Sequence, residues 1–120
     1  MSLLMSLKIL GHPETEFKKG EIIIQEATPG GKVFVLCEGA VKVTLEGKDI
    51  ATCNEAGEII GEIATIKGCN YGATVTATED SRFFVIDDLL SYVKQNPEDS
   101  IKIMKTLCER IVKMNQNAVS

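Results

Sequence analysis

The sequence is poor in the residues on which much protein chemistry depends. It has no tryptophan and a single histidine, His12, among 120 residues. A metal site of the kind held by small β-barrel metalloenzymes therefore lacks its histidine ligands. The sequence also contains no GxSxG, GxxxxGK[ST] or GxGxxG motif, which mark hydrolases, P-loop nucleotidases and dinucleotide-dependent enzymes. We therefore expect a nonenzymatic protein with no catalytic residues and no bound metal.

Long apolar runs and an excess of positive charge are missing as well. No stretch approaches the ~18 apolar residues of a membrane span, and the apolar start, Met1 to Leu10, contains Lys8 and precedes no small-residue cleavage site. The 13 basic and 17 acidic residues give a net charge of −4, which repels phosphate backbones and anionic lipid. We expect a cytoplasmic protein that binds neither membrane nor nucleic acid directly.

The four cysteines do not form a recognisable pair. Cys37, Cys53, Cys69 and Cys108 are widely separated and include no CxxC or CxH spacing. Such spacings are typical of zinc sites and redox dithiols. We expect reduced, mostly buried thiols, because free cysteine packs as a small hydrophobic residue.

The first two-thirds of the chain has the pattern of a β-structure. The length suits a single domain, and glycines separate short apolar runs rich in β-branched and aromatic residues. Glu46-Gly47-Lys48 is typical of a tight hairpin loop. The expected strands are Glu21 to Ile24, Val33 to Cys37, Val41 to Leu45, Asp49 to Cys53, Ala73 to Ala77 and Arg82 to Ile86.

Two helices are expected after Ile86, where glycine disappears and apolar residues recur at helical spacing. The first is capped by Asp87 or Asp88 and ends near Asn96. The second has Asn96 as its N-cap and Pro97 at its first position, and it runs to about Asn117. Short strands followed by two helices indicate an α+β domain with a barrel or sandwich.

The last expected helix has two apolar edges. One is formed by Ile101, Met104, Cys108 and Ile111, and its neighbour by Ile103, Leu107 and Met114. Two interpretations are open: the whole stripe is wide and faces the core, or the extra edge with Ile103, Leu107 and Met114 faces a partner. The second gives the hypothesis of a homodimer through this helix, with the barrel adding contacts.

The segment from Glu55 to Ala77 offers groups that could hold an anion. Gly61 followed by Glu62 is compatible with the start of a helical turn, whose free backbone N–H groups bind phosphate. Gly72 and Ala73 add amides without a bulky side chain, and Glu62 would accept a hydrogen bond from a sugar hydroxyl. The alternative is that the glycines only form turns and that Glu62 is a solvated acid.

Several ordered motifs resemble one family. Phe17 to Ile23, Val33 to Gly39 with Val41 to Val43, Gly57 to Ala64, and Ala73 to Ala77 are similar to successive motifs of the cyclic nucleotide-binding domain, and the resemblance extends to about Ile111. It implies an antiparallel β-barrel of the jelly-roll type with a short cassette helix and two C-terminal helices. The expected parts are an N-terminal segment over 1–16, a barrel over 17–86 and helices over 87–118, all in one domain.

The resemblance also implies a binding site for a cyclic nucleotide such as cAMP or cGMP. Gly61 and Ala64 would give amides to the cyclic phosphate, Glu62 would face the barrel pocket and bind the ribose 2′-hydroxyl, and Ala73 and Thr74 would line the pocket. No cofactor is expected. The predicted ligand-binding residues are Gly61, Glu62, Ile63, Ala64, Tyr71, Gly72, Ala73 and Thr74.

Two departures from the family pattern bear on function. Tyr71 stands where the family has an arginine that pairs with the phosphate, and Ala27 stands where a glycine is usual. A tyrosine donates one neutral hydrogen bond in place of a charge-assisted pair. We therefore expect a regulatory domain that binds a cyclic nucleotide or related small anion weakly. The alternative is a protein interaction or dimerisation module that has lost nucleotide binding.

Overall fold

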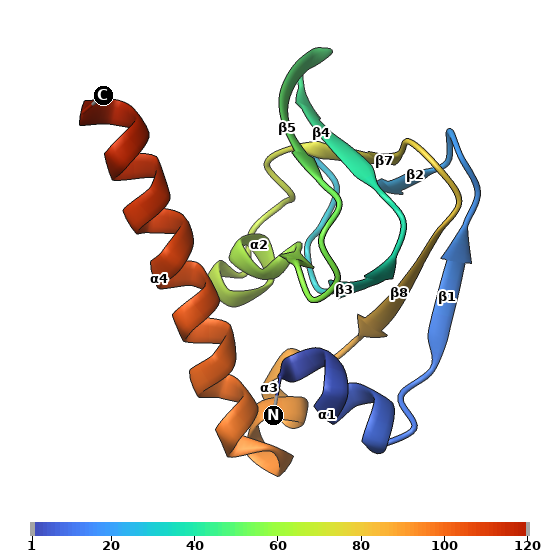
Figure 1. Ribbon diagram of the computed structural model, residues 1–120, viewed down its shortest axis with the longest axis vertical. Helices are drawn as coiled ribbons and strands as arrows, with labels where there is room; N and C mark the ends of the chain where they lie inside the picture. The colour runs from blue at the N-terminus through green and yellow to red at the C-terminus, as the bar shows by residue number, and fades with distance from the viewer. Residues whose placement is uncertain (1, 120) are drawn as a thin grey trace.

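The computed structural model describes residues 2–119, with the side chains of residues 113–119 outside the description. Two four-stranded antiparallel sheets face each other and helices gather at one end and along one side, as Figure 1 shows. The first sheet has the order β1 (Glu14–Phe17), β8 (Ser81–Ile86), β3 (Val33–Glu38) and β6 (Ile59–Ile60). The second has the order β2 (Ile22–Ile24), β7 (Thr74–Ala77), β4 (Val41–Leu45) and β5 (Lys48–Cys53). The expected α+β jelly-roll fold is confirmed.

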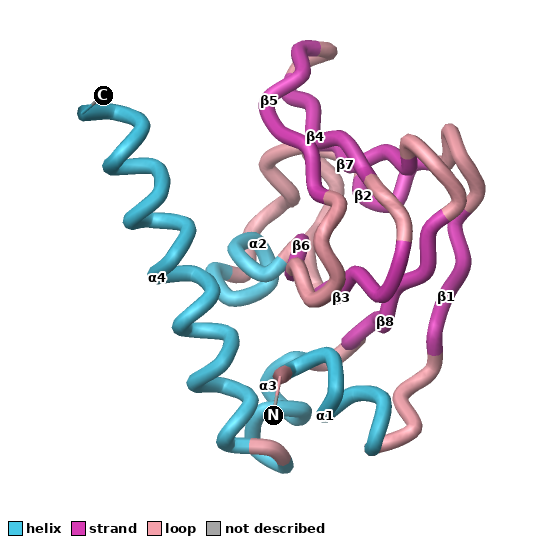
Figure 2. The backbone as a smooth tube through the Cα atoms, viewed as in Figure 1, coloured by secondary structure: helices cyan, strands magenta, loops and turns pink. Residues whose placement is uncertain are grey.

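The hairpin between β4 and β5 forms at the expected glycine. Its loop is Glu46-Gly47, and both residues have positive φ, 51° and 81°. Positive φ at both central residues is what a type I′ turn requires, and the twist of that turn matches the twist of paired strands. The hairpin extends away from the rest of the barrel in Figure 2.

The N-terminal segment forms a helix that the sequence analysis did not predict. Helix α1 (Leu3–Ile9) begins after Ser2, whose hydroxyl accepts a hydrogen bond from the Met5 N–H at 3.2 Å. Leu3 and Leu7 are buried because they lie one turn apart on the same face. The segment thus contributes to the core, and the first strand begins at Glu14, before the expected start of the barrel.

The C-terminal helices begin close to the expected residues. In α3 (Leu89–Gln95) the Asp88 carboxylate accepts from the Ser91 N–H at 3.1 Å, which confirms Asp88 as the cap. Helix α4 (Pro97–Val119) begins at Pro97. The side chain of Asn96, expected as its N-cap, donates to the Tyr92 carbonyl at 3.0 Å and so closes the end of α3.

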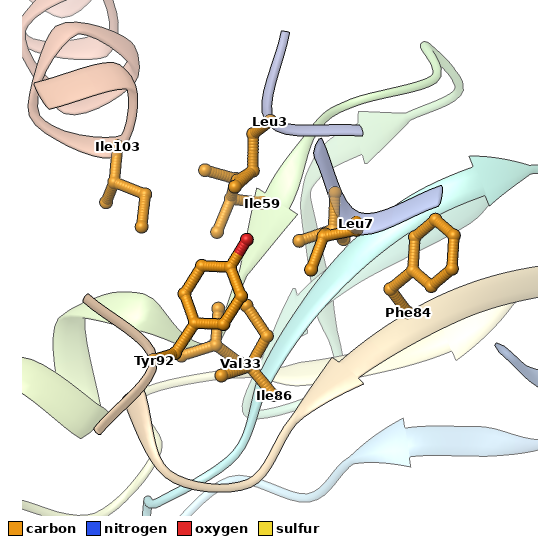
Figure 3. Packing of buried hydrophobic residues seen from close by; sticks show 9 residues of the cluster. Leu3, Leu7, Val33, Ile59, Phe84, Ile86, Tyr92 and Ile103 are labelled. Atoms are coloured by element: carbon orange, nitrogen blue, oxygen red, sulfur yellow. The ribbon is translucent and has the colours of Figure 1, made fainter. Parts of the chain in front are cut away.

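Two apolar clusters form the core. The cluster between the sheets includes edge-to-face contacts among Phe17, Phe34 and Phe83. The other lies where α1, α3 and α4 cover the first sheet, and Figure 3 shows Tyr92 among the aliphatic side chains of this cluster. Ile103 of α4 belongs to it. The helices are therefore attached to the barrel through a continuous apolar layer.

The structure decides which edge of α4 faces the core. Ile103 is 4% exposed and Leu107 packs against the same cluster. Ile101, Met104 and Ile111 are each more than half exposed. The core-facing edge is therefore the second of the two predicted edges, so the interpretation that this edge faces a partner was wrong. The first edge lies open. The side chain of Met114 is outside the described residues.

The cysteines are free, and their burial differs from the expectation. Cys37 and Cys53 are half-buried, whereas Cys69 and Cys108 are exposed. The prediction of mostly buried thiols was therefore wrong for the last two. Among residues 2–119, no helix has both the length and the apolar character that crossing a membrane requires.

Candidate functional site

The cassette predicted from the sequence is built by β6, α2 (Glu62–Lys67) and the loop that leads to β7. Gly61 is the N-cap of α2, with φ 86°, and a Cβ at this position would lie 2.7 Å from the Lys32 carbonyl oxygen. The backbone conformation and the tight approach both require glycine. The helical turn expected after Gly61 is present in the structure.

Glu62, the first residue of α2, is buried and paired. Its side chain is 2% exposed, and its Oε1 accepts a hydrogen bond from Nη1 of Arg110 on α4. Nη2 of the same guanidinium donates to the carbonyl oxygen of Ile59. Burial raises the pKa of Glu62, and the Arg110 charge offsets part of this effect. Glu62, which the sequence analysis predicted to bind a sugar hydroxyl, is thus paired with a cation from the C-terminal helix.

Tyr71 is bound to a loop of the protein. Its hydroxyl donates to the Lys32 carbonyl at 2.8 Å and accepts from the Lys32 N–H at 3.0 Å. A phenol has a single proton to donate, and the bond to the Lys32 carbonyl uses it. Tyr71 also lies in the wall of a cavity of about 700 Å³, together with Ile24, Phe34 and Asp87.

The loop between β2 and β3 is bonded to the cassette loop along its backbone. The Ala27 N–H donates to the Tyr71 carbonyl at 2.9 Å, and the Tyr71 N–H donates to the Thr28 carbonyl at 2.9 Å. Ala27 has φ 65°, a conformation that glycine adopts without strain. The glycine that is usual at this position in the family would relieve that strain. The presence of Ala27 therefore affects the conformation of the loop between β2 and β3.

Thr74, at the start of β7, is held in the same way. Its hydroxyl donates to Oε2 of Glu26 at 2.9 Å and accepts from the Glu26 N–H at 3.2 Å. Both groups come from the loop that also holds Tyr71. Three predicted polar residues, Glu62, Tyr71 and Thr74, therefore have three different partners within the chain.

The remaining predicted residues differ in exposure. Ala64 is 6% exposed and Ala73 is half-buried, whereas Ile63 and Gly72 are exposed. The eight predicted ligand-binding residues thus lie in one stretch of chain, from Gly61 to Thr74, and differ in how far they are buried. The part of the chain that the structure describes holds no group of three or more His, Cys, Asp or Glu side chains arranged for a metal ion.

Sequence reasoning did not assign a role to Arg110, Lys32 or Glu26. Arg110 lies 48 positions after Glu62, and no local motif joins the two. One pattern could have indicated the contact, because Arg110 follows Leu107 and Ile103 at about one and two helical turns. A cation on the core-facing edge of α4 needs an acid partner.

The comparison with protein families decides the assignment. The model of the cyclic nucleotide-binding domain matches residues 14–96. The chain belongs to this family. It is 35% identical over 74 residues to the cGMP-dependent protein kinase egl-4 of Caenorhabditis briggsae, covering 62% of this chain and 10% of the kinase. This domain therefore spans about a tenth of that relative's length.

Solved structures share the fold. The catabolite activator protein of Thermus thermophilus aligns with a TM-score of 0.78 at 18% identity, over 96% of this chain and 57% of that one. The cGMP-bound form of the EAL enzyme Bd1971 aligns with a TM-score of 0.64 at 26% identity, over 89% of this chain and 30% of that one. In both structures this fold makes up part of a longer chain.

Proposed function

We propose that this cyclic nucleotide-binding domain is a nonenzymatic regulatory module that works in the cytoplasm and binds a cyclic nucleotide, or a related small anion, weakly. The family assignment and the names of its relatives, a cGMP-dependent kinase among them, support the ligand class. The prediction of weak affinity rests on Tyr71. Its hydroxyl proton is used by the Lys32 carbonyl, at the position where the family has the phosphate-binding arginine.

The expected loss of affinity for the nucleotide follows from the positive charge that an arginine at position 71 would supply and Tyr71 does not. Hydrogen bonds to charged groups contribute about 1.5–3 kcal/mol each. Removing one such bond weakens binding by at least about tenfold. Arg110 does not replace the missing arginine, because its guanidinium bonds Glu62 and the Ile59 carbonyl. The ligand would rely on backbone amides near Gly61, Ala64 and Ala73.

Calorimetric titration with cAMP and with cGMP tests this proposal. The unmodified chain should bind weakly or not measurably, and Tyr71→Arg should bind at least about tenfold more tightly. Tyr71→Phe is the matched control, because it also removes the hydrogen bonds to Lys32 but adds no charge, and it should give no gain. Submicromolar binding by the unmodified chain, or no improvement in Tyr71→Arg, would contradict the proposal.

A second candidate is an interaction or dimerisation module that has kept the barrel without the ligand. The internal partners of Glu62, Tyr71 and Thr74 favour it, because each of these three polar side chains is already bonded within the chain. The same titration separates the two functions. If Tyr71→Arg folds and still binds neither nucleotide, the interaction module is the better description.

A further inference from the structure

A second cavity lies among the helices. It has a volume of about 500 Å³ and is lined by residues of α2, α3 and α4, by the two residues before α3 and by Gly31. Helix α4 runs past α2 and α3 in Figure 1. None of the eight predicted ligand-binding residues belongs to the lining of this cavity. A molecule bound here would therefore not occupy the predicted nucleotide site.

The lining of this helical cavity is mainly aliphatic. Its buried part includes Ile103, which is 4% exposed, and Leu107, which packs against the same cluster. Each of the three helices also contributes a large exposed side chain, because Ile66 is 57% exposed, Leu90 63% and Met104 54%. Exposed apolar side chains that gather around a hollow are typical of ligand-binding grooves.

The two hydroxyl groups in the described lining are bonded within the chain. Thr65 Oγ1 donates to the Gly61 carbonyl at 2.8 Å. Ser100 Oγ donates to the Pro97 carbonyl at 2.5 Å. Because a hydroxyl has one proton to donate, a ligand in the cavity would find no free hydroxyl donor on these side chains.

The charge in the described lining is negative. Its charged residues are Asp87 and Asp88 alone, which precede α3. Asp88 accepts from the N–H and the hydroxyl of Ser91, at 3.1 and 2.9 Å. Asp87 lies 3.9 Å from Lys32 Nζ, and these two side chains are 76% and 63% exposed. Such an exposed pair is weak, so the Asp87 carboxylate is available to another cation.

We propose that this cavity binds a small organic cation with an apolar body, whose ammonium group lies at Asp87 and Asp88. The inference goes beyond the proposed function, because it concerns another ligand and other residues. The apolar body would gain free energy by covering the aliphatic walls. The flexible thioether of Met104 adapts to the shape of such a body and favours contact with an aromatic ring. An anion would instead meet two carboxylates.

Three probes with the same phenylbutyl body test the proposal on the full chain. Phenylbutylamine carries a cation, phenylbutanol is neutral and phenylvalerate carries an anion. NMR of isotope-labelled valine and leucine methyl groups follows Val93 in the cavity wall and Leu45 on β4, which is outside the cavity. The amine should shift the Val93 signal saturably and leave the Leu45 signal in place. The Kd of the amine should be the lowest, by up to about fivefold per carboxylate relative to the alcohol.

A pair of tryptophan variants locates the bound probe. Leu90→Trp places a large ring at the exposed part of the lining and should abolish the Val93 shift, because the ring takes the space of the probe. Ile50→Trp is the matched control, because Ile50 is 56% exposed but lies on β5, and it should leave the shift unchanged. Circular dichroism checks that both variants are folded.

A pair of charge variants tests the preference for a cation. Asp87→Asn combined with Asp88→Asn removes both carboxylates and keeps a good N-cap residue for α3. This variant should raise the Kd of the amine to that of the alcohol. Asp49→Asn combined with Glu46→Gln removes two exposed charges from the β4–β5 hairpin and changes the net charge equally, so it should leave the Kd unchanged. If Leu90→Trp does not fold, this pair carries the test.

Four results would overturn the proposal. The first is a Val93 signal that the amine does not shift up to millimolar concentration. The second is a shift that persists in folded Leu90→Trp, which would place the probe elsewhere. The third is an anionic probe that binds as tightly as the amine. The fourth is a Val93 signal that moves with protein concentration and no longer responds to the amine, which would show a second copy in the cavity. None of these measurements uses a cyclic nucleotide, so the proposed function stands or falls separately.

Discussion

At the residue scale, Gly61 shows how closely the cassette approaches the loop before β3. It has φ 86°, and a Cβ there would lie 2.7 Å from the Lys32 carbonyl oxygen and 3.2 Å from the Tyr71 ring. Gly57 has a similar φ of 94°, but a Cβ there would meet no atom within 4 Å. The two glycines therefore share the backbone strain that a side chain would cause and differ in the available space.

This difference gives a prediction about Gly61→Ala. Backbone strain of an L-residue in the left-handed region costs about 1–2 kcal/mol, so Gly57→Ala should lower the free energy of unfolding by roughly that amount. Gly61→Ala should lower it by at least ~1 kcal/mol more, because the backbone carbonyl of Lys32 must also move. Urea unfolding monitored by circular dichroism measures both. Equal losses in the two variants would show that the loop yields to the methyl group.

Residue types near the cassette were more predictable than their partners. The glycine at 61 and the cap at Asp88 could be predicted because both act within a few residues of the chain. The partner of Tyr71 lies 39 positions away and that of Glu62 lies 48 positions away. Such pairs depend on how distant elements pack, which local spacing does not determine.

At the element scale, one polar residue holds three helices together. Asp99 of α4 is 4% exposed and accepts from the Ser6 hydroxyl of α1 at 3.1 Å and from the Tyr92 hydroxyl of α3 at 2.5 Å. Lys102 Nζ donates to the same carboxylate at 2.8 Å. Burial opposes ionisation of Asp99, but the bonds from Lys102, Tyr92 and Ser6 hold its pKa below the usual value.

The lowered pKa of Asp99 predicts how stability depends on pH. A carboxyl whose folded pKa lies below its unfolded value of 3.8 stabilises the fold fully above that value. The contribution is lost as the pH falls through the folded pKa. Asp99→Asn should therefore lower the free energy of unfolding by about 2 kcal/mol at pH 7. The difference in this free energy between the variant and the unmodified chain should narrow below about pH 4.

Thermal unfolding at pH 7, 5 and 3 measures this gap. Asp87→Asn is the matched control, because the Asp87 side chain is 76% exposed and its Lys32 partner lies 3.9 Å away. Such an exposed pair contributes little to stability, so the difference in stability between Asp87→Asn and the unmodified chain should be small at every pH. A difference for Asp99→Asn that stays constant down to pH 3 would mean that the pKa of Asp99 is the same in the folded and the unfolded chain.

The elements that sequence analysis missed are those with the least local information. Helix α1 has only 7 residues, and its Leu3 and Leu7 gain their burial from α4 and the first sheet. Strand β6 consists of two residues paired with β3. The two edges of α4 were both visible in the sequence, but the packing of Ile103 onto the α1 and α3 cluster decided which one is covered.

At the scale of the whole molecule, the open edge of α4 is an uncovered apolar surface among the described residues. Ile101 is 52% exposed, Met104 54% and Ile111 58%, and Cys108 on the same edge is exposed. The edge that the chain covers by itself is the one that contains Ile103 and Leu107. A homodimer through α4 would therefore use the Ile101 edge, because Ile103 and Leu107 pack against the core.

We therefore predict that the chain forms a concentration-dependent dimer that Met104→Glu combined with Ile111→Glu weakens. Both side chains lie on the open edge, and two carboxylates there would be buried without partners in the interface. Ile22→Glu is the matched control, because Ile22 is 53% exposed but lies on β2. Sedimentation at micromolar concentration should show a mass above that of one chain for the unmodified protein and for the control. The α4 double variant should sediment as a monomer with unchanged helix content. An unmodified chain that stays monomeric over this range would leave the Ile101 edge as ordinary exposed surface of the domain.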